Sequence, residues 1–403
     1  MSEYQVTMAK GWFKRAAIPV GIVAIAIGAF VLLWKGPWLF DGSHLRKDNL
    51  QPADGLVITG FRTMVVAIIA STLAGLGLLY THVTLQHTRN KDAEQATLVR
   101  EGQMTDRYAT AIELIAASEL TKRLGGIYAL ERIMRDSPKD HETIVEVLAA
   151  FVREHAPRPE QDLEAESERE YAPMPEHVQA ALTVLGRRPE RSESFAVNLR
   201  NTDLRGLVLP NARLRGVNLR GAFMEYAELP ATDLTGAQME KCHLENADLT
   251  GAVLTQAILK KARLYQTSLD LADLSKAKLN YAIVRNCGLG AATMRGVNLH
   301  SAQVIRTDLE RADLSQAQMM VAKFDKSWLN NAILTGALLH GTDLSQARDL
   351  EVDQVLAAKI KYNTKLPPDL LAEQAVAARV SQAEQEARKR ARMSVPKQTE
   401  VSE

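Results

Sequence analysis

The sequence predicts a membrane-anchored chain whose larger part is an all-β solenoid. Two apolar stretches near the N-terminus are long enough to span a bilayer. A five-residue repeat runs without interruption from Leu199 to Leu344, and apolar residues at helical spacing fill the part between. The predicted fold class is therefore two N-terminal transmembrane helices, a short α-helical connector and an all-β solenoid with a helical C-terminal tail.

Composition narrows the classes of function before any motif is considered. The 403 residues carry 49 Lys and Arg against 48 Asp and Glu, so the formal net charge of +1 gives no whole-chain attraction to nucleic acid. Two cysteines exclude a disulfide scaffold and a four-cysteine zinc site, and they fit a reducing compartment. Only 5% of the residues are aromatic although 46% are apolar, which indicates a core packed with few rings.

Two apolar stretches are the candidate membrane spans. Residues 16–34 contain no charge and would extend roughly 28 Å as a helix. Residues 55–82 are interrupted by Arg62 alone, which lies near one end and can reach the headgroups. A secretory signal peptide is the alternative for the first stretch, because a basic segment precedes it and Ala24-Ile-Ala26 resembles a cleavage site. The apolar run continues past that site to Trp34, so we predict a span.

Basic residues predict the orientation of the two spans. Six of them flank the pair and three lie in the short external loop, residues 35–54, so the tail 1–15 and the C-terminal part are both expected inside. Cleavage of the first stretch would still leave the C-terminal part inside. The expected location is the cell membrane, multi-pass, with the C-terminal domain in the cytoplasm. The flanking residues are Lys10, Lys14, Arg15, Arg89, Lys91 and Arg100, and the loop residues are Lys35, Arg46 and Lys47.

Residues 90–156 are expected to form an amphipathic helical connector of three helices. Apolar residues in about 93–117 and again in 120–134 each fall on one helical stripe. Ser137 and Pro138 have the residue types of an N-cap and a first helical position, so a third helix is expected to begin there.

Two short segments separate this connector from the repeats. Residues 157–175 hold four prolines and a run of acidic residues, which predicts a linker. Residues 176–188 have apolar residues at helical spacing and predict a short helix that caps the repeat region.

The repeat within residues 195–350 is the strongest signal in the chain. Counting in fives from Leu199 to Leu344 gives 30 positions, of which 23 are Leu and none is polar. A small residue, usually Ala, stands two positions earlier. A period of five fits neither a helix nor a strand, so each repeat is expected to form one side of a coil. The expected core includes Leu199, Leu204, Leu249, Leu264, Leu269, Leu274, Leu309, Leu314 and Leu344.

Stretches such as Ala247-Asp248-Leu249-Thr250-Gly251 match the motif A(D/N)LXX, and this region resembles the pentapeptide-repeat family. The resemblance implies a right-handed quadrilateral β-helix with 20 residues per coil, hence about seven and a half coils and a rod roughly 36 Å long. The flanking segments 123–133 and 179–188 resemble parts of uncharacterised membrane-anchored bacterial pentapeptide-repeat proteins. That second likeness implies an architecture and no activity.

Nothing in the sequence predicts catalysis. It contains no Ser/His/Asp grouping, no phosphate-binding loop and no Cys-x-x-Cys pair. Cys242 and Cys287 occupy small inward positions roughly 10 Å apart, too far for a disulfide. His300 and His340 share a face two coils apart, too far to hold one metal ion. We predict no enzyme activity, no catalytic, cofactor-binding or metal-binding residue, and no cofactor.

The N-terminal end of the repeats is rich in arginine. Between Arg187 and Arg220 eight arginines face three acidic residues, a net charge of +5. They fall on several faces and form a collar, either solvated or in contact with anionic lipid headgroups or a polyanion. The candidate contact residues are Arg187, Arg188, Arg200, Arg205, Arg215 and Arg220.

Three apolar residues mark the other end. Trp328, Ile333 and Leu338 occupy outward positions that are usually polar, on three successive faces of the last complete coil. Either residues 351–371 fold back over them as a C-terminal cap, or a second rod covers them. The tail 372–403 is rich in Ala, Glu and Gln and is expected to be flexible and partly helical.

The expected function is a membrane-anchored cytoplasmic scaffold or protein-interaction module without catalytic activity. Some members of the resembled family mimic DNA and bind topoisomerase, which is the alternative, and a component of a membrane transport or signalling assembly is a third. Residues 196–350 carry 18 basic and 15 acidic residues, and a net charge of +3 argues against DNA mimicry. The expected partners are the membrane and an unidentified protein, with a homodimer through the C-terminal end left open and nucleic acid not expected.

Overall fold

The computed structural model describes residues 23–40, 42, 45, 51–159 and 173–393. The chain forms two compact units, Met1–Gly102 and Gln103–Glu403. Several expected segments lie wholly or partly outside the described residues. These are the tail 1–15, the start of the span 16–34, part of the loop 35–54, the centre of the linker 157–175 and the last ten residues.

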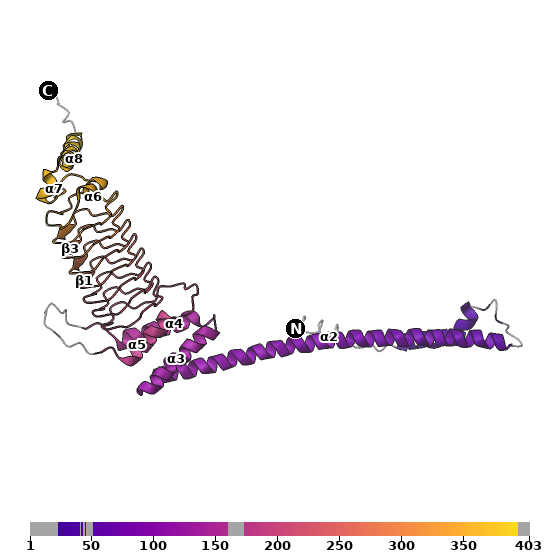
Figure 1. Ribbon diagram of the computed structural model, residues 1–403. Coiled ribbons are helices and arrows are strands. Elements are labelled where there is room, and N and C mark those ends of the chain that lie inside the picture. Colours follow the sequence, from indigo (N-terminus) through magenta and orange to yellow (C-terminus); the bar gives the residue numbers. More distant parts are fainter. Residues whose placement is uncertain (1–22, 41, 43–44, 46–50, 160–172, 394–403) are drawn as a thin grey trace, which may run out of the picture. The chain divides into compact units, whose positions relative to one another are not determined.

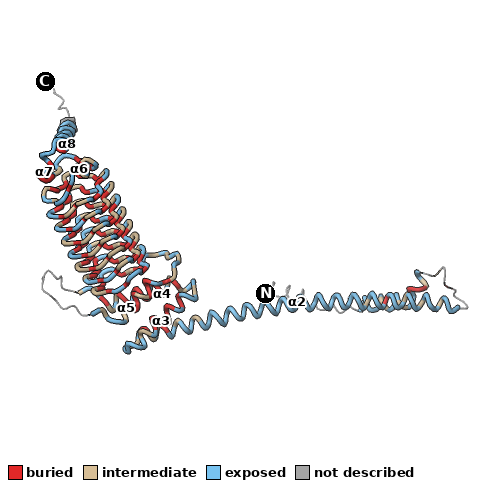
Figure 2. The backbone as a smooth tube through the Cα atoms, in the orientation of Figure 1, coloured by how far each residue is buried: buried red, intermediate tan, exposed pale blue. Residues whose placement is uncertain are grey.

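The first unit contains a helix over Val23–Phe40 and most of α2, Pro52–Ile115. The Arg62 side chain donates to the Leu33 carbonyl at 3.2 Å, and the rings of Phe40 and Phe61 stack at 5.8 Å, so the two helices contact each other. Most of their apolar side chains are nevertheless exposed, as the pale tube of α2 in Figure 2 shows.

Helix α2 is longer than the sequence predicted. We expected one helix to end near residue 82 and another to begin near residue 93, but α2 is a single helix of 64 residues. Residues 83–101 contain neither proline nor glycine, so nothing in the segment ends the helix. The last residues of α2 belong to the second unit, where Ala111 and Ile115 are buried.

Three helices then pack on one another: α3, Leu120–Asp136; α4, His141–His155; and α5, Glu176–Gly186. Their apolar stripes are buried, as expected for amphipathic helices in a common core. Gly126 of α3 lies so close to the end of α2 that a Cβ there would be 2.5 Å from the backbone nitrogen of Ile115. A glycine is therefore required at this helix crossing.

The expected start of α4 was wrong. Ser137 is extended, with φ −119° and ψ 107°, and its N–H donates to the Ile133 carbonyl, so it ends α3. A residue before proline is disfavoured in helical conformation, and Pro138 enforces that here. Helix α4 begins only after Asp140, the N-cap residue.

The repeat region is a stack of coils (Figure 1). Parallel bridges join residues 20 positions apart in four series, which begin at Asn198, Asp203, Val208 and Arg213. Each coil therefore has four sides. On one face the pairing is regular enough to form four short strands in the order β1-β2-β3-β4. These are β1 Arg263–Tyr265, β2 Ile283–Arg285, β3 Gln303–Ile305 and β4 Lys323–Asp325.

The inward positions fill the interior of this stack, which Figure 2 colours as buried. All nine leucines expected in the core are at most 2% exposed. Polar residues at the small inward position donate to backbone carbonyls: Thr232 Oγ1 donates to Leu209 at 2.7 Å, and Cys242 Sγ to Leu219 at 2.8 Å. Burial raises the pKa of the Cys242 thiol to about 12, so this cysteine stays protonated.

The chain turns each corner through a residue with positive φ, and these corners also recur every five residues. Eight of the corner residues are glycines, such as Gly236 at φ 67°. The others are mostly polar, but Val321 at φ 59° is β-branched, a residue type that strains in the left-handed region.

After Leu344 the coil loses its regular register. The next bridges join Leu338 to Lys359 and Asp343 to Lys365, so the final turn is longer than 20 residues. Helix α6, Val352–Ala357, takes the place of one side, and α7, Pro368–Ala372, follows the turn. Helix α8, Gln374–Met393, occupies most of the segment expected to be flexible, and its Val376 is fully buried.

Candidate functional site

The N-terminal end of the solenoid meets the helices α3, α4 and α5, and here the arginines gather. The first coil would expose unpaired backbone groups if nothing covered it. Gln179 of α5 pairs with the backbone of Val208 through both its amide atoms, at 2.7 and 3.1 Å. The segment after α4 pairs too, because the N–H of Asp203 donates to the Ala156 carbonyl at 2.9 Å.

A buried ion pair lies beneath this junction. Arg188 donates to both carboxylate oxygens of Glu193, at 2.6 and 3.0 Å, and also to the carbonyls of Leu185 and Arg213. The carboxyl also contacts Nε2 of the buried His141 at 3.1 Å. Burial alone would raise the pKa of Glu193, but the hydrogen bonds and charge of Arg188 outweigh it and the pKa is lowered.

Two further arginines donate hydrogen bonds to backbone carbonyls at or just after the C-terminal ends of helices. Arg191 donates to the carbonyls of Met134 and Arg135 at 2.7 and 3.0 Å, at the C-terminus of α3. Arg213, from the first coil, donates to the Arg188 carbonyl at 2.7 Å, just after α5. A guanidinium at a helix C-terminus pairs with carbonyls that have no partner within the helix.

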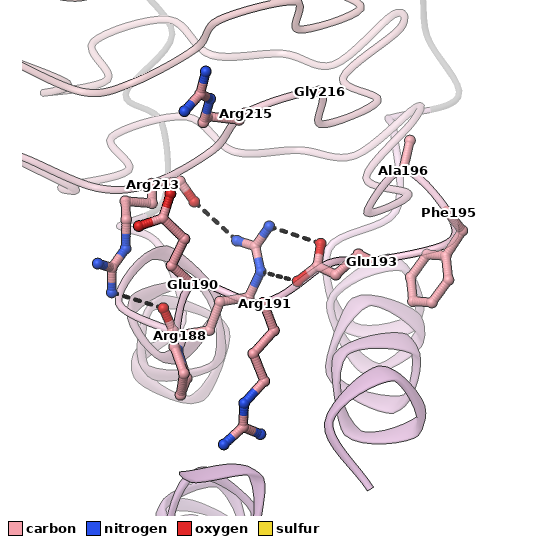
Figure 3. Close-up of a pocket in the computed structure, with 10 residues that line it drawn as sticks. Arg188, Glu190, Arg191, Glu193, Phe195, Ala196, Arg213, Arg215 and Gly216 are labelled. Atoms are coloured by element: carbon pink, nitrogen blue, oxygen red, sulfur yellow. Dashed lines mark hydrogen bonds and ion pairs between the residues drawn. The ribbon is translucent and has the colours of Figure 1, made fainter. Parts of the chain in front are cut away.

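These side chains line a cleft of about 410 Å³ between the segment after α5 and the first coils (Figure 3). Most of the guanidinium groups around it already donate to protein acceptors. Arg215 is the more open one, 61% exposed and 3.5 Å from the Asp233 carboxylate. The arginines that line the cleft therefore join the helices to the solenoid. Arg215 and Glu190 are the lining residues whose charged groups face solvent.

Most of the six arginines expected to contact an anionic surface also pair with acidic residues of the chain. Arg187 pairs with Glu131 at 2.7 Å, Arg205 with Asp203 at 2.5 Å and Arg220 with Glu240 at 2.8 Å. Their charges are thus largely compensated within the chain, whereas Arg200 is exposed. Contact of this collar with lipid headgroups or a polyanion stays a prediction.

At the other end, the chain itself covers the last coil. Gln354 of α6 donates to the carbonyls of Leu329 and Ala332 at 2.8 and 2.7 Å. Residues of the segment 351–371 are buried with the solenoid core; they are Val355, Ala358, Ile360, Leu366 and Leu370.

Of the three apolar residues of the last complete coil, Leu338 pairs with the cap segment, whereas Trp328 pairs with Arg348, which precedes it. Trp328 is half-buried with the Arg348 guanidinium 5.1 Å from its ring, and Leu338 is half-buried beside Lys359. Ile333 stays 46% exposed. A dimer through this end stays a prediction, which the mass of the purified chain tests.

The family profile described as Pentapeptide repeats matches residues 198–236, 232–270 and 317–348, in eight copies. The solenoid is therefore built of pentapeptide repeats. The sequence-based resemblance to this family is thereby confirmed. No curated protein matches the chain.

Solved pentapeptide-repeat structures resemble parts of the chain. HetL, involved in heterocyst differentiation regulation in the cyanobacterium Nostoc, is 28% identical over 43% of this chain and 84% of its own, with a TM-score of 0.35. QnrB1, a plasmid-mediated fluoroquinolone resistance protein, is 14% identical over 47% of this chain and 97% of its own, with a TM-score of 0.22. Rfr23 of Cyanothece is 20% identical over 40% of this chain and 90% of its own, with a TM-score of 0.12. At these TM-scores, no partner or activity is carried over to the chain.

Within the pentapeptide repeats, sequence reasoning missed one cluster. Glu225, His243 and Glu245 each offer a ligand atom within 4.8 Å of the others. The spacing carried a signal, because residues 20 apart lie on adjacent coils and Glu225 and Glu245 are 20 apart. Comparing histidines only with one another overlooks a histidine that lies beside two carboxylates.

Proposed function

We propose that the chain is a membrane-anchored interaction module, with its pentapeptide-repeat domain in the cytoplasm and no catalytic activity of its own. The observation that supports membrane anchoring is that most apolar side chains of the two N-terminal helices are exposed and not packed against other parts of the chain. The helix Val23–Phe40 and the apolar window of α2 have mean hydropathies of 1.8 and 2.0, yet only 11% and 6% of these windows is buried.

The exposed side chains are large. Ile25, Leu56 and Leu78 are each more than 70% exposed. Removing one such side chain from water is worth about 1.5–3 kcal/mol, so two helices of this kind favour a hydrocarbon environment strongly. Length and composition alone also fit a signal sequence for the first helix. N-terminal sequencing of the purified chain separates the two, because cleavage would remove most of that helix.

The repeats suit a binding role. A solenoid holds its outward side chains on a fixed grid, about 4.8 Å apart from coil to coil, and offers an extended surface to a partner. The net charge of +3 within residues 196–350 disfavours the DNA-mimicking alternative. We therefore favour a protein partner, and a transport or signalling assembly is one setting for it.

Reporter fusions test the anchor and its orientation. A reporter active only in the cytoplasm is fused near Asn49, and in a second strain to the C-terminus. We expect activity from the C-terminal fusion and none from the loop fusion. Strong activity from the loop with none from the C-terminus would overturn the orientation. Activity from both would show that the chain does not cross the membrane as proposed.

Partner capture tests the interaction role. The full chain is cross-linked in native membranes, purified in detergent and its partners are identified by mass spectrometry. We expect a protein recovered in proportion to the bait and lost with a bait that ends before the repeats. Recovery of a topoisomerase as the main partner would favour the alternative instead.

A further inference from the structure

The coil repeat places two glutamates and a histidine together on one outer face. Phe223 and His243 form a parallel bridge between adjacent coils, so Glu225 and Glu245, each two residues further along, are also neighbours. His243 Nδ1 is 3.8 Å from Oε1 of Glu225 and 3.8 Å from Oε1 of Glu245. The three side chains are only 15%, 22% and 17% exposed, in the order Glu225, His243, Glu245.

Each glutamate keeps one oxygen without a protein partner. Oε2 of Glu225 and Oε2 of Glu245 are buried, and neither has a hydrogen-bond partner among the described residues. A buried carboxylate oxygen without a partner carries a desolvation cost that a bound cation offsets. Burial raises the pKa of Glu225 to about 7 and raises that of Glu245 as well.

The neighbouring side chains orient this cluster and occupy part of it. The Arg263 side chain pairs with Oε1 of Glu245 at 3.0 Å, so Oε2 is the oxygen of Glu245 that remains for a cation, while Arg205 pairs with Asp203. The ring of Phe223, itself 1% exposed, stacks on the imidazole of His243 with centroids 4.4 Å apart. The histidine ring is therefore held in one plane, with Nδ1 towards the carboxylates.

We propose that Glu225, His243 and Glu245 bind one divalent transition-metal ion of the Zn²⁺ type, which links two adjacent coils. With metal–ligand bonds of about 2.1 Å, His243 Nδ1 and Oε1 of Glu225 at 3.8 Å subtend about 130° at an ion between them, wider than the about 109° of a tetrahedral site, so we expect these side chains to move slightly closer on binding. The partial exposure leaves room for water as a fourth ligand. One imidazole with two carboxylates selects Zn²⁺ or Co²⁺ over Mg²⁺ and Ca²⁺.

Equilibrium dialysis of the full chain in detergent against Zn²⁺ tests the proposal. We expect one Zn²⁺ per chain and a rise in melting temperature with Zn²⁺ concentration. Glu225→Gln and Glu245→Gln should each weaken binding by on the order of 10- to 100-fold. Co²⁺ bound at the site should show visible d–d absorption that His243→Gln abolishes.

Matched controls keep the test decisive. Glu228→Gln, on the neighbouring face of the same coil, and His300→Gln should leave Zn²⁺ binding unchanged. Glu225→Gln should melt no lower than the parent without metal, because it removes repulsion between the two carboxyl groups. Glu245→Gln also loses its ion pair with the half-exposed Arg263, so Glu225→Gln is the variant that separates loss of metal from loss of stability. Equal Zn²⁺ binding by the parent and both site variants, or Mg²⁺ bound as tightly as Zn²⁺, would overturn the proposal, as would no binding.

Discussion

The two ends of the solenoid solve one physical problem in different ways. Each end would leave backbone groups unpaired, and each is covered by its own chain. At the N-terminal end, the cover is a separate helical layer joined by charged side chains, where the buried Arg188 pairs with the largely covered Glu193. At the C-terminal end, the chain continues the coil with a longer turn, and Gln354 is a neutral donor to the last carbonyls.

The difference predicts where the molecule responds to conditions. Charged groups lose their interactions when pH or salt changes, and neutral hydrogen bonds and apolar burial respond far less. We therefore expect the N-terminal end to be the more sensitive one. The C-terminal end has an ion pair too, between Lys365 and Asp343 at 3.1 Å, but this lysine is 68% exposed and solvent screens the pair, so length and packing should matter more there.

The largest loss of stability is expected from a substitution in the middle of the solenoid, and this loss is the reference for substitutions at the two ends. Leu264→Asp places an unpaired carboxylate in a dry core and should cost several kcal/mol, enough to unfold coils on either side. Tyr265→Asp, at a position 39% exposed, is the control and should cost little. Chemical denaturation in detergent, followed by circular dichroism, measures both, and equal midpoints would show that the assigned register is wrong.

The next effect is expected at the N-terminal end. Arg188→Ala leaves the largely covered carboxylate of Glu193 with His141 alone and removes the hydrogen bonds to the carbonyls of Leu185 and Arg213, so the free energy of unfolding should fall by about 3 kcal/mol. Arg200→Ala removes an exposed arginine and should change it by less than about 0.5 kcal/mol. A similar loss of unfolding free energy in both variants would mean that the Arg188–Glu193 pair contributes no more to stability than an exposed arginine does.

A smaller effect is expected at the C-terminal end. Gln354→Ala deprives the carbonyls of Leu329 and Ala332 of a donor and should cost about 1–3 kcal/mol. The loss should be the same at pH 5 and pH 8, since no charge is involved. A strongly pH-dependent loss would remove the contrast between the two ends.

The smallest effect is the response of the N-terminal end to acid. The pKa of Glu193 is lower in the folded chain than the ordinary 4.5, so its contribution to stability is present above pH 4.5 and is lost as pH falls through the folded value. Melting temperatures of the parent and of Glu193→Gln should therefore converge as pH falls from 6 to 3. Curves that stay parallel over this range would contradict the lowered pKa.

The repeat was predictable because each position in it has a fixed environment. A Leu at every fifth residue is enough to place Leu264 inside and Tyr265 outside. The helices that cover the N-terminal end of the solenoid were harder to predict from the sequence, because Ser137-Pro138 fits the start of one helix as well as the end of another. The role of Arg188 depended on Glu193 being buried beside it, which no local pattern reveals. The continuity of α2 could have been predicted from the lack of proline and glycine between its two parts.

We propose that the two apolar N-terminal helices anchor the chain in a membrane, and alkaline extraction of membranes from cells that express the full chain shows whether they do. We expect the parent chain to stay in the membrane pellet. A variant with Ile68→Arg and Leu73→Arg places two charges mid-span, at about 2.5–3.5 kcal/mol each, and should be partly released. Complete release of the parent chain at alkaline pH, at the same level as a soluble protein, would show that these helices do not anchor it.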